Sequence, residues 1–508
     1  MPDQVRHDSA SWSKTIHLLR KTTRNTCEPM NNLSDGYAVF VKRDCATCVL
    51  VSPVLAEMRA AGLPLTIYTQ DDPTFPDGMD DITSDLSLEA AFHNDIETVP
   101  TLLRIEGGKE KARAVGWVRD EWLDLSQLPD IGSGLPAMRP GCGSKSVEPG
   151  IAERLAVEFG NVPITSRRIE ISEIEDDAEA CYDRGWTDGL PVVPPTRERV
   201  WRMLQGTNRA PDEVVGIMPP DLVECTVEKV AVNAVMAGCK PEYMPLVLAA
   251  VEGALQDEFC LHGLLATTWF SGPVLVVNGP EARRVGMNAK GNAMGQGNRA
   301  NATIGRALQL IVRNVGGGRP GEVDRSCLGN PGKYTFCFAE DEEGSAWDSL
   351  AVERGFDATA STVTLFAGDG VQPIFDQRSR QPEDLARTFS LCLRSINHPE
   401  MAMIGDAILV VSPEHERVFR EAGWDKARLR AELDELLLMP EADSDPSLSR
   451  KDMKMPTRAS KMRPGGLLIV RAGGGAGMFS AVIGGWVASG EKGSIPVTQK
   501  VSSREVSE

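Results

Sequence analysis

The 508-residue chain has only 6 histidines and 5 tyrosines, and it has no long uninterrupted hydrophobic run. Its longest apolar candidates, Leu467–Val470 and Phe479–Val487, are short or broken by glycine, whereas a membrane-spanning helix needs about 20 apolar residues. The amino terminus is polar and lacks the apolar core of a secretory signal. We therefore expect a cytoplasmic protein with no membrane partner.

Basic residues are scarce relative to acidic ones. The chain has 54 Lys and Arg against 72 Asp and Glu, for a net charge of −18. Such a field repels polyanions, so nucleic acid is not an expected partner, although locally basic clefts are still allowed. We expect a small-molecule substrate, and assembly into a homo-oligomer is left open.

Complete nucleotide-binding and zinc motifs are missing too. Gly473-Gly474-Gly475-Ala476-Gly477 follows an apolar strand, but neither a Gly-Lys-Ser/Thr ending nor a whole G-x-G-x-x-G motif with its acid is present. Eleven cysteines are scattered along the chain, a pattern typical of buried thiols in a reducing compartment, where a close pair is a redox device. Cys45 and Cys48 form such a pair, and no second close Cys/His pair completes a zinc site. No cofactor is firmly implied.

The spacing of Cys45 and Cys48 has a specific chemical consequence. The pair follows an apolar strand predicted over 37–42 and precedes a helix predicted over 51–61. The first thiol then lies at a helix amino terminus, where peptide dipoles favour its anion. Cys45 is the expected nucleophile, and Cys48, one turn further on, is the expected resolving thiol. Half of a zinc site, or two inert buried thiols, are the alternatives.

Residues 33–128 read as strand, helix, strand, helix, strand, strand, helix. Together with this order, the segments YAVFVKRDCATC and ETVPTLL resemble the thioredoxin superfamily. The resemblance implies that Pro100 is a cis proline beside the dithiol and that the dithiol cycles through a redox-active disulfide. The pair Ala-Thr replaces the family's Gly-Pro, and the buried acid and nearby Trp of thioredoxin are not evident.

The rest of the chain predicts a second, larger α/β domain. We expect a flexible lead over 1–32, a linker and helix over 129–184, the large domain over 185–490 and a tail over 491–508. Apolar strands at 273–277, 407–411 and 467–470 each run into a loop, a pattern that favours a buried, mostly parallel sheet. Sites in such sheets lie beyond the carboxyl ends of the strands, so the three loops are expected to converge.

A glycine- and amide-rich loop within 292–301 precedes a helix predicted over 303–314. Free N–H groups at such a helix start, together with Arg299 and Arg306, favour binding of a carboxylate or phosphate, with Asn298 and Asn301 orienting the ligand. Lys333 is a further candidate for anion binding. The alternative is a tight turn with surface cations.

Two candidates for proton transfer lie in the same region. Glu340 begins a run of four acids at the end of a strand predicted over 334–339, where it can hold a divalent cation or serve as acid or base. A solvated acidic turn is the alternative. His415 lies just after the strand 407–411 and is expected to face the crevice, unless it is a surface histidine.

Residues 185–485 also resemble bacterial UGSC-type (seleno)proteins, a group without an established reaction. The motifs that carry the resemblance lie at 185–196, 227–231, 297–307 and 333–343. The selenocysteine-Gly-Ser-Cys tetrad of that group is absent, but Cys142-Gly143-Ser144-Lys145 matches its middle. The match makes Cys142 a third redox candidate, and a linker cysteine is the alternative.

These observations predict a thiol-dependent redox enzyme. In it, the dithiol serves an α/β domain that acts on a small anionic or sulfur-containing molecule, with a thiol reductant or reductase as partner. A redox-sensing ligand-binding protein without turnover and a protein that handles soft metals through thiolates are the alternatives.

Overall fold

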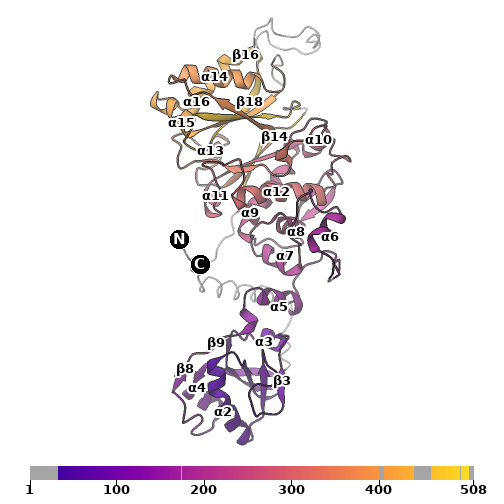
Figure 1. Ribbon diagram of the computed structural model, residues 1–508, viewed down its shortest axis with the longest axis vertical. Coiled ribbons are helices and arrows are strands. Elements are labelled where there is room, and N and C mark those ends of the chain that lie inside the picture. Colours follow the sequence, from indigo (N-terminus) through magenta and orange to yellow (C-terminus); the bar gives the residue numbers. More distant parts are fainter. Residues whose placement is uncertain (1–32, 173, 400–404, 440–458, 492, 503–508) are drawn as a thin grey trace. The chain divides into compact units, whose positions relative to one another are not determined.

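The structure is a computed structural model that describes residues 33–172, 174–399, 405–439, 459–491 and 493–502 (Figure 1). The lead predicted over 1–32 lies outside them. The chain divides into two units at Pro163 and Ile164, inside the segment 129–184 that was predicted to be a linker. Both units combine helices with sheets, so the α/β class is confirmed.

The first unit contains a five-stranded sheet in the order β3-β2-β1-β5-β6. Its central strand β1 pairs in parallel with β2, which pairs in parallel with β3, whereas the β1–β5 and β5–β6 pairs are antiparallel. The elements are β1 (Gly36–Val41), α2 (Ala46–Ala60), β2 (Leu65–Thr69), β3 (Ile82–Ser84), α3 (Glu89–His93), β5 (Thr101–Glu106), β6 (Lys109–Val115), α4 (Arg119–Ser126) and α5 (Ile151–Phe159).

The segment after α4 belongs to this unit, which corrects the predicted linker. Within it, β8 (Met138–Arg139) pairs with β7 (Trp117–Val118), and β9 (Cys142–Gly143) pairs with β4 (Thr98–Val99). A Cβ added at Gly141 would lie 2.4 Å from the Thr98 Cγ2 and 2.7 Å from the Val99 oxygen. Glycine therefore permits the close approach of this segment to β4.

The second unit contains a seven-stranded sheet in the order β13-β12-β14-β19-β15-β18, with β20 paired to β14. The β12–β13 and β15–β18 pairs are parallel, and the other pairs in this sheet are antiparallel. The prediction of a mostly parallel sheet is therefore wrong. Its strands are β12 (Gly272–Asn278), β13 (Cys337–Ala339), β14 (Thr362–Phe375), β15 (Gly405–Val411), β18 (Met462–Arg471), β19 (Phe479–Gly485) and β20 (Val497–Lys500). Strand β20 lies in the segment that was predicted to be a tail.

Both faces of this sheet are covered, which explains the apolar runs that the sequence shows. On β15, Leu409 and Val411 belong to one core cluster, which also contains Phe389 and Phe419 from the helices. Val410 belongs to a second cluster on the other face. A strand buried on both faces reads as a continuous apolar run whichever way its neighbours point, so the run does not reveal strand direction.

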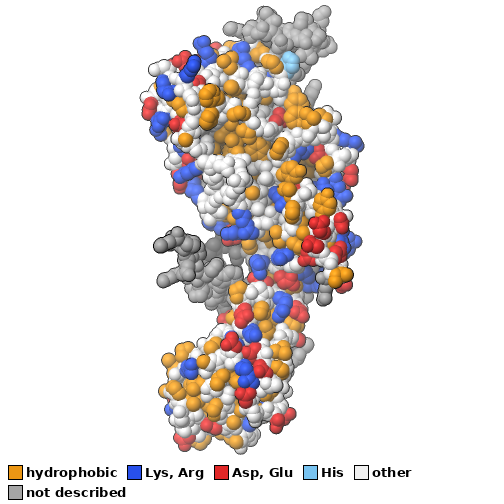
Figure 2. Space-filling view, in the orientation of Figure 1, with side chains coloured by type: hydrophobic (Ala, Val, Ile, Leu, Met, Phe, Trp, Pro, Cys, Tyr) orange, Lys and Arg blue, Asp and Glu red, His pale blue; other side chains and the backbone are white. Residues whose placement is uncertain are grey.

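Short strands and helices complete the second unit. They are α6 (Asp177–Asp183), α7 (Arg197–Leu204), β10 (Val214–Met218), β11 (Val223–Thr226), α8 (Val227–Ala237), α9 (Met244–Ala254), α10 (Leu261–Ala266), α11 (Pro280–Arg284), α12 (Arg299–Asn314), α13 (Leu350–Glu353), α14 (Pro382–Arg394), α15 (Pro413–Glu421), α16 (Lys426–Leu436), β16 (Leu438–Met439) and β17 (Ala459–Ser460). In the described parts of the chain, no helix is long and apolar enough to cross a membrane. Figure 2 shows basic and acidic side chains interspersed on the face that it draws.

Candidate active site

Cys45 occupies the N-cap position of α2, directly after the central strand β1. Its backbone is extended, with φ −148°, and its sulfur accepts a hydrogen bond from the Cys48 N–H at 3.2 Å. Its thiol donates to the Val99 carbonyl at 3.4 Å. Both cysteines are free thiols, so the site is described in its reduced state. The N-cap contact places the Cys45 sulfur where the helix favours an anion.

The surroundings of Cys45 stabilise its thiolate. The hydrogen bond from the Cys48 thiol is the main cause that lowers the pKa of Cys45 to about 5, against the opposing effect of burial. The Cys142 thiol and the backbone N–H groups of Cys48 and Thr47 lower this pKa further. Burial, followed by the hydrogen bond to Cys45, raises the pKa of Cys48 far above its ordinary value. One thiol of the pair is therefore prepared to ionise while the other keeps its proton.

Pro100 lies beside this pair, and the Val99–Pro100 peptide bond is cis. Val99 is the residue whose carbonyl meets the Cys45 thiol. The residue before the proline thus contacts the candidate nucleophile directly.

Cys142 lies close to the dithiol, although it comes from a distant part of the sequence. It is opposite Val99 in the β4–β9 pairing, and the Cys142 and Cys45 thiols shift each other's pKa. The Thr47 hydroxyl also donates to the Pro140 carbonyl at 2.6 Å. The interpretation of Cys142 as a linker cysteine is therefore wrong, because its segment packs against the start of α2.

In the second unit, the residues predicted to bind an anion are engaged within the protein. Asn298 caps α12 by accepting from the Asn301 N–H at 3.1 Å. Asn301 is buried and uses its amide to hold the preceding loop through Asn288 and Ala293. Helix α12 starts at Arg299 rather than at Thr303, so this loop is fixed by its own amides.

The three predicted cations also have internal partners. Arg306 makes two hydrogen bonds of 2.8 Å to the Asp188 carboxylate. Arg299 donates to the Gly238 carbonyl at 2.9 Å, and Lys333 pairs with Asp324 at 2.7 Å. These contacts hold segments of the fold together. The three side chains therefore do not form an open anion-binding site in this structure.

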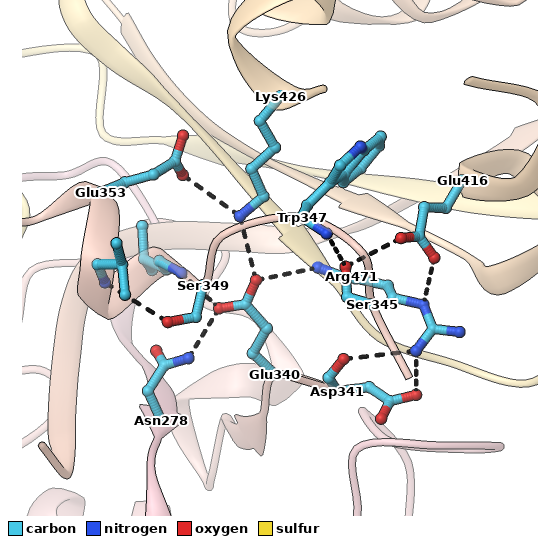
Figure 3. Close-up of polar contacts among 12 residues, drawn as sticks. Asn278, Glu340, Asp341, Ser345, Trp347, Ser349, Glu353, Glu416, Lys426 and Arg471 are labelled. Atoms are coloured by element: carbon cyan, nitrogen blue, oxygen red, sulfur yellow. Dashed lines mark hydrogen bonds and ion pairs between the residues drawn. The ribbon is translucent and has the colours of Figure 1, made fainter. Parts of the chain in front are cut away.

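Glu340 lies in a buried polar network (Figure 3). Its carboxylate accepts from the Asn278 amide at 2.8 Å and from the Leu350 N–H at 2.7 Å, and it pairs with Lys426 at 3.2 Å. Glu340 and Asp341 are buried and face cations or backbone donors, so the first half of the run 340–343 is not a solvated turn. Glu342 is half-buried and Glu343 is exposed in a turn, as the alternative predicted.

The network brings together the loops that follow the three predicted strands. Asn278 ends β12, Arg471 ends β18, and Glu416 lies on the helix that follows β15. Arg471 pairs with Asp341 and, at 2.8 Å, with Glu416, as Figure 3 shows. The expected convergence of these loops is therefore present, in a sheet of mixed direction.

His415 is fully buried and does not face a crevice. One ring nitrogen lies 2.7 Å from the Ser480 hydroxyl, and the other lies 3.0 Å from the Asp376 carbonyl. Burial lowers the pKa of His415, and its ring packs edge-on against Phe389. Its contacts join β19, α14 and the end of β14, so the expectation that it faces the crevice is wrong.

A cavity of about 730 Å³ in the second unit was missed by sequence reasoning. Basic, acidic and apolar side chains share its lining, which includes Arg167, Arg168, Arg197, Lys229, Glu170, Asp177, Glu228, Trp186, Val200 and Met236. Burial, and then the charge of Arg168, lower the pKa of Arg197, which indicates two cations near one another. Arg167 and Arg168 belong to a segment without periodic apolar residues, so no sequence pattern marked them.

Among the residues that the structure describes, no group of three or more His, Cys, Asp or Glu side chains is arranged to hold a metal ion. Comparisons with family models, with curated proteins and with solved structures found no match to this chain.

Proposed function

We propose that the first unit is a thioredoxin-like domain that carries out thiol–disulfide exchange through Cys45 and Cys48. The observation that carries the proposal is the Cys45 sulfur at the start of α2, which accepts the Cys48 N–H and lies beside Val99. Attack on a disulfide requires a thiolate. The thiol and the N–H of Cys48 favour the thiolate of Cys45, and they help to lower its pKa to about 5.

The strand order of the first unit supports the thioredoxin-like assignment. Strand β1 runs directly into the dithiol helix α2, and the parallel partner β2 follows that helix. The antiparallel pair β5 and β6 lies on the other side of β1 and leads into α4. The periodicity of residues 33–128 predicts this order, but it does not predict β3, which lies between β2 and α3.

The second unit is proposed to bind the molecule that the dithiol serves, a small anionic or sulfur-containing compound. Its support is the cavity lined by Arg168, Arg197 and Lys229 together with apolar side chains. An anion placed beside Arg168 and Arg197 would offset the repulsion between the exposed Arg168 and the partly buried Arg197. Because both units belong to one chain, the dithiol is present at a high effective concentration for a ligand held there. The resemblance of residues 185–485 to UGSC-type proteins stays a prediction.

The redox proposal is tested by reduction of oxidised glutathione by the full chain, with dithiothreitol as the final reductant. Replacing Cys45 with Ser should abolish the protein-dependent rate, because serine supplies no thiolate. The Cys392→Ser variant serves as a matched control, since it removes a partly buried thiol of the second unit and should keep the rate. An unchanged rate in the Cys45→Ser variant would overturn the proposal.

The ligand proposal is tested by equilibrium binding of a panel of small thiol carboxylates and sulfonates. Arg168→Gln should weaken binding of a carboxylate about 10-fold or more, because a charged hydrogen bond contributes about 1.5–3 kcal/mol. The uncharged amide of the same compound should bind equally to both proteins. Equal affinity of the carboxylate for both proteins would contradict the site. A difference in affinity between the reduced and oxidised protein, without turnover, would instead indicate redox sensing.

A further inference from the structure

We propose that Cys142 is a third redox-active thiol of this site, and that it resolves mixed disulfides on Cys45 in parallel with Cys48. The inference rests on the proposed function, because it requires Cys45 to act as the nucleophile. It goes beyond the dithiol, since it assigns a catalytic role to a residue outside the Cys-x-x-Cys pair.

The position of Cys142 is fixed by backbone pairing. Cys142 lies opposite Val99, and the Val99 carbonyl accepts from the Cys45 thiol at 3.4 Å. Val99, which contacts the Cys45 thiol, is therefore also the pairing partner of Cys142. This arrangement brings the two thiols close enough for each to shift the pKa of the other.

The segment that carries Cys142 is anchored on both sides of the cysteine. Before it, the Pro140 carbonyl accepts from the Thr47 hydroxyl at 2.6 Å. After it, the fully buried Ser144 exchanges hydrogen bonds with Gln70, and the Ser146 hydroxyl donates to the Ile96 carbonyl at 2.5 Å. Because both flanks are held, Cys142 stays beside Cys45, as a reacting group must.

Exposure and charge distinguish the two candidate resolving thiols. Cys48 is fully buried, whereas Cys142 is partly exposed. Burial and the neighbouring Cys45 raise the pKa of Cys142, but the Thr47 N–H and the charge of Lys42 oppose that rise. The pKa of both thiols is raised, so exposure is the main difference between them: Cys142 lies at the edge of the site, where a released thiolate can leave into water.

The proposed step balances without a further reactant. The Cys45 thiolate attacks a disulfide R–S–S–R, forms Cys45–S–S–R and releases one thiolate. Cys142, after losing its proton, attacks the Cys45 sulfur of the mixed disulfide, forms the Cys45–Cys142 disulfide and releases the second thiolate. The substrate disulfide is reduced by two electrons, two protein thiols are oxidised, and the two protons lost by the protein end on the released thiols.

A single-turnover experiment tests this step. The reduced full chain is mixed with one equivalent of oxidised glutathione, free thiols are alkylated in acid, and the tryptic peptides are identified by mass spectrometry. Trypsin leaves Cys45 and Cys48 together in the peptide 44–59, and Cys142 remains in a separate peptide. A Cys45–Cys142 disulfide therefore joins two peptides, whereas a Cys45–Cys48 disulfide stays within one.

The variants that lack Cys48 give the decisive result. When Cys48→Ser reacts with one equivalent of oxidised glutathione, the Cys45–Cys142 disulfide should form and join the two peptides. Under the same conditions the wild type should form the Cys45–Cys48 disulfide. In Cys48→Ser/Cys142→Ser, glutathione should remain attached to Cys45. Cys48→Ala is the second variant, because a serine hydroxyl in this buried position can prevent folding. Cys327→Ser, which removes an exposed thiol of the second unit, should not change the products.

The possible outcomes separate this inference from the proposed function. A glutathione adduct that persists on Cys45 in both Cys48→Ser and Cys48→Ala would overturn the role of Cys142 and leave Cys45 as the nucleophile. An absence of any adduct or disulfide at Cys45 in the wild type would overturn both proposals.

Discussion

Gln70 and Ser144 exchange two hydrogen bonds in the interior of the first unit. The Gln70 amide donates to the Ser144 hydroxyl at 2.8 Å, and that hydroxyl donates back to the Gln70 carbonyl oxygen at 3.1 Å. The same oxygen also accepts from the Lys145 N–H at 3.0 Å. One side chain at the end of β2 thus holds the segment that carries Cys142.

Replacing Gln70 with Ala should lower the free energy of unfolding by about 1–3 kcal/mol, because buried groups of Ser144 and Lys145 lose their partner. Chemical denaturation measures this change, with Gln377→Ala as a control, since Gln377 is exposed and its side chain donates one hydrogen bond, to the Gly477 carbonyl. The variant should also give less Cys45–Cys142 disulfide. An undiminished yield would mean that the strand pairing alone positions Cys142.

The reactivity of Cys45 should follow a low pKa. Since the pKa of Cys45 is lowered to about 5, the thiolate is populated above that pH, and the rate of alkylation by iodoacetamide should fall as the pH drops through about 5. An ordinary thiol would lose reactivity near pH 8.5 instead. Peptide-resolved alkylation rates measure the midpoint.

Cys48→Ala should move this midpoint upward by more than Cys142→Ala does. The reason is that the hydrogen bond from Cys48 is the larger of the two contributions to the pKa of Cys45. Equal midpoints in both variants and the wild type would show that the helix terminus alone sets the pKa.

Arg306 and Arg299 should differ in their effect on stability. Arg306 holds the Asp188 carboxylate with two hydrogen bonds, and lysine cannot reproduce this planar geometry. Arg306→Lys should therefore lower the unfolding free energy by about 1.5–3 kcal/mol. Arg299 is exposed and donates one hydrogen bond to the Gly238 carbonyl. Arg299→Lys should therefore change the free energy of unfolding by less than about 0.5 kcal/mol. Thermal unfolding of the two variants compares them directly.

Lys426 and Arg428 provide a similar comparison on α16. Lys426 is 4% exposed and pairs with the buried Glu340, so Lys426→Met leaves an unpaired carboxylate and should cost about 3–5 kcal/mol. Arg428 is 57% exposed and pairs with Glu432, and Arg428→Met should cost no more than about 1 kcal/mol. Equal denaturation midpoints for the two variants would contradict the network of Figure 3.

Features set by neighbouring residues were predictable from the sequence. The strands at 273–277, 407–411 and 467–470 are present, and the position of Cys45 at a helix start follows from the strand before it and the periodicity after it. The roles predicted for Arg306 and His415 were not correct. Arg306 pairs with Asp188 and His415 contacts Ser480, but the sequence around each residue would be the same if its partner were a ligand. Those partners lie far away in the sequence.

The sequence by itself determined the α/β class, the apolar strands at 273–277, 407–411 and 467–470, and the Cys45–Cys48 pair at a helix start, since these depend on apolar periodicity and local spacing. Only the tertiary structure decided the direction of the strands in the large sheet, the place of Cys142 beside Cys45, and the cavity near Arg168 and Arg197. Each of these depends on which distant segments pair, and pairing is fixed by the packing of the whole unit rather than by any short stretch of the chain.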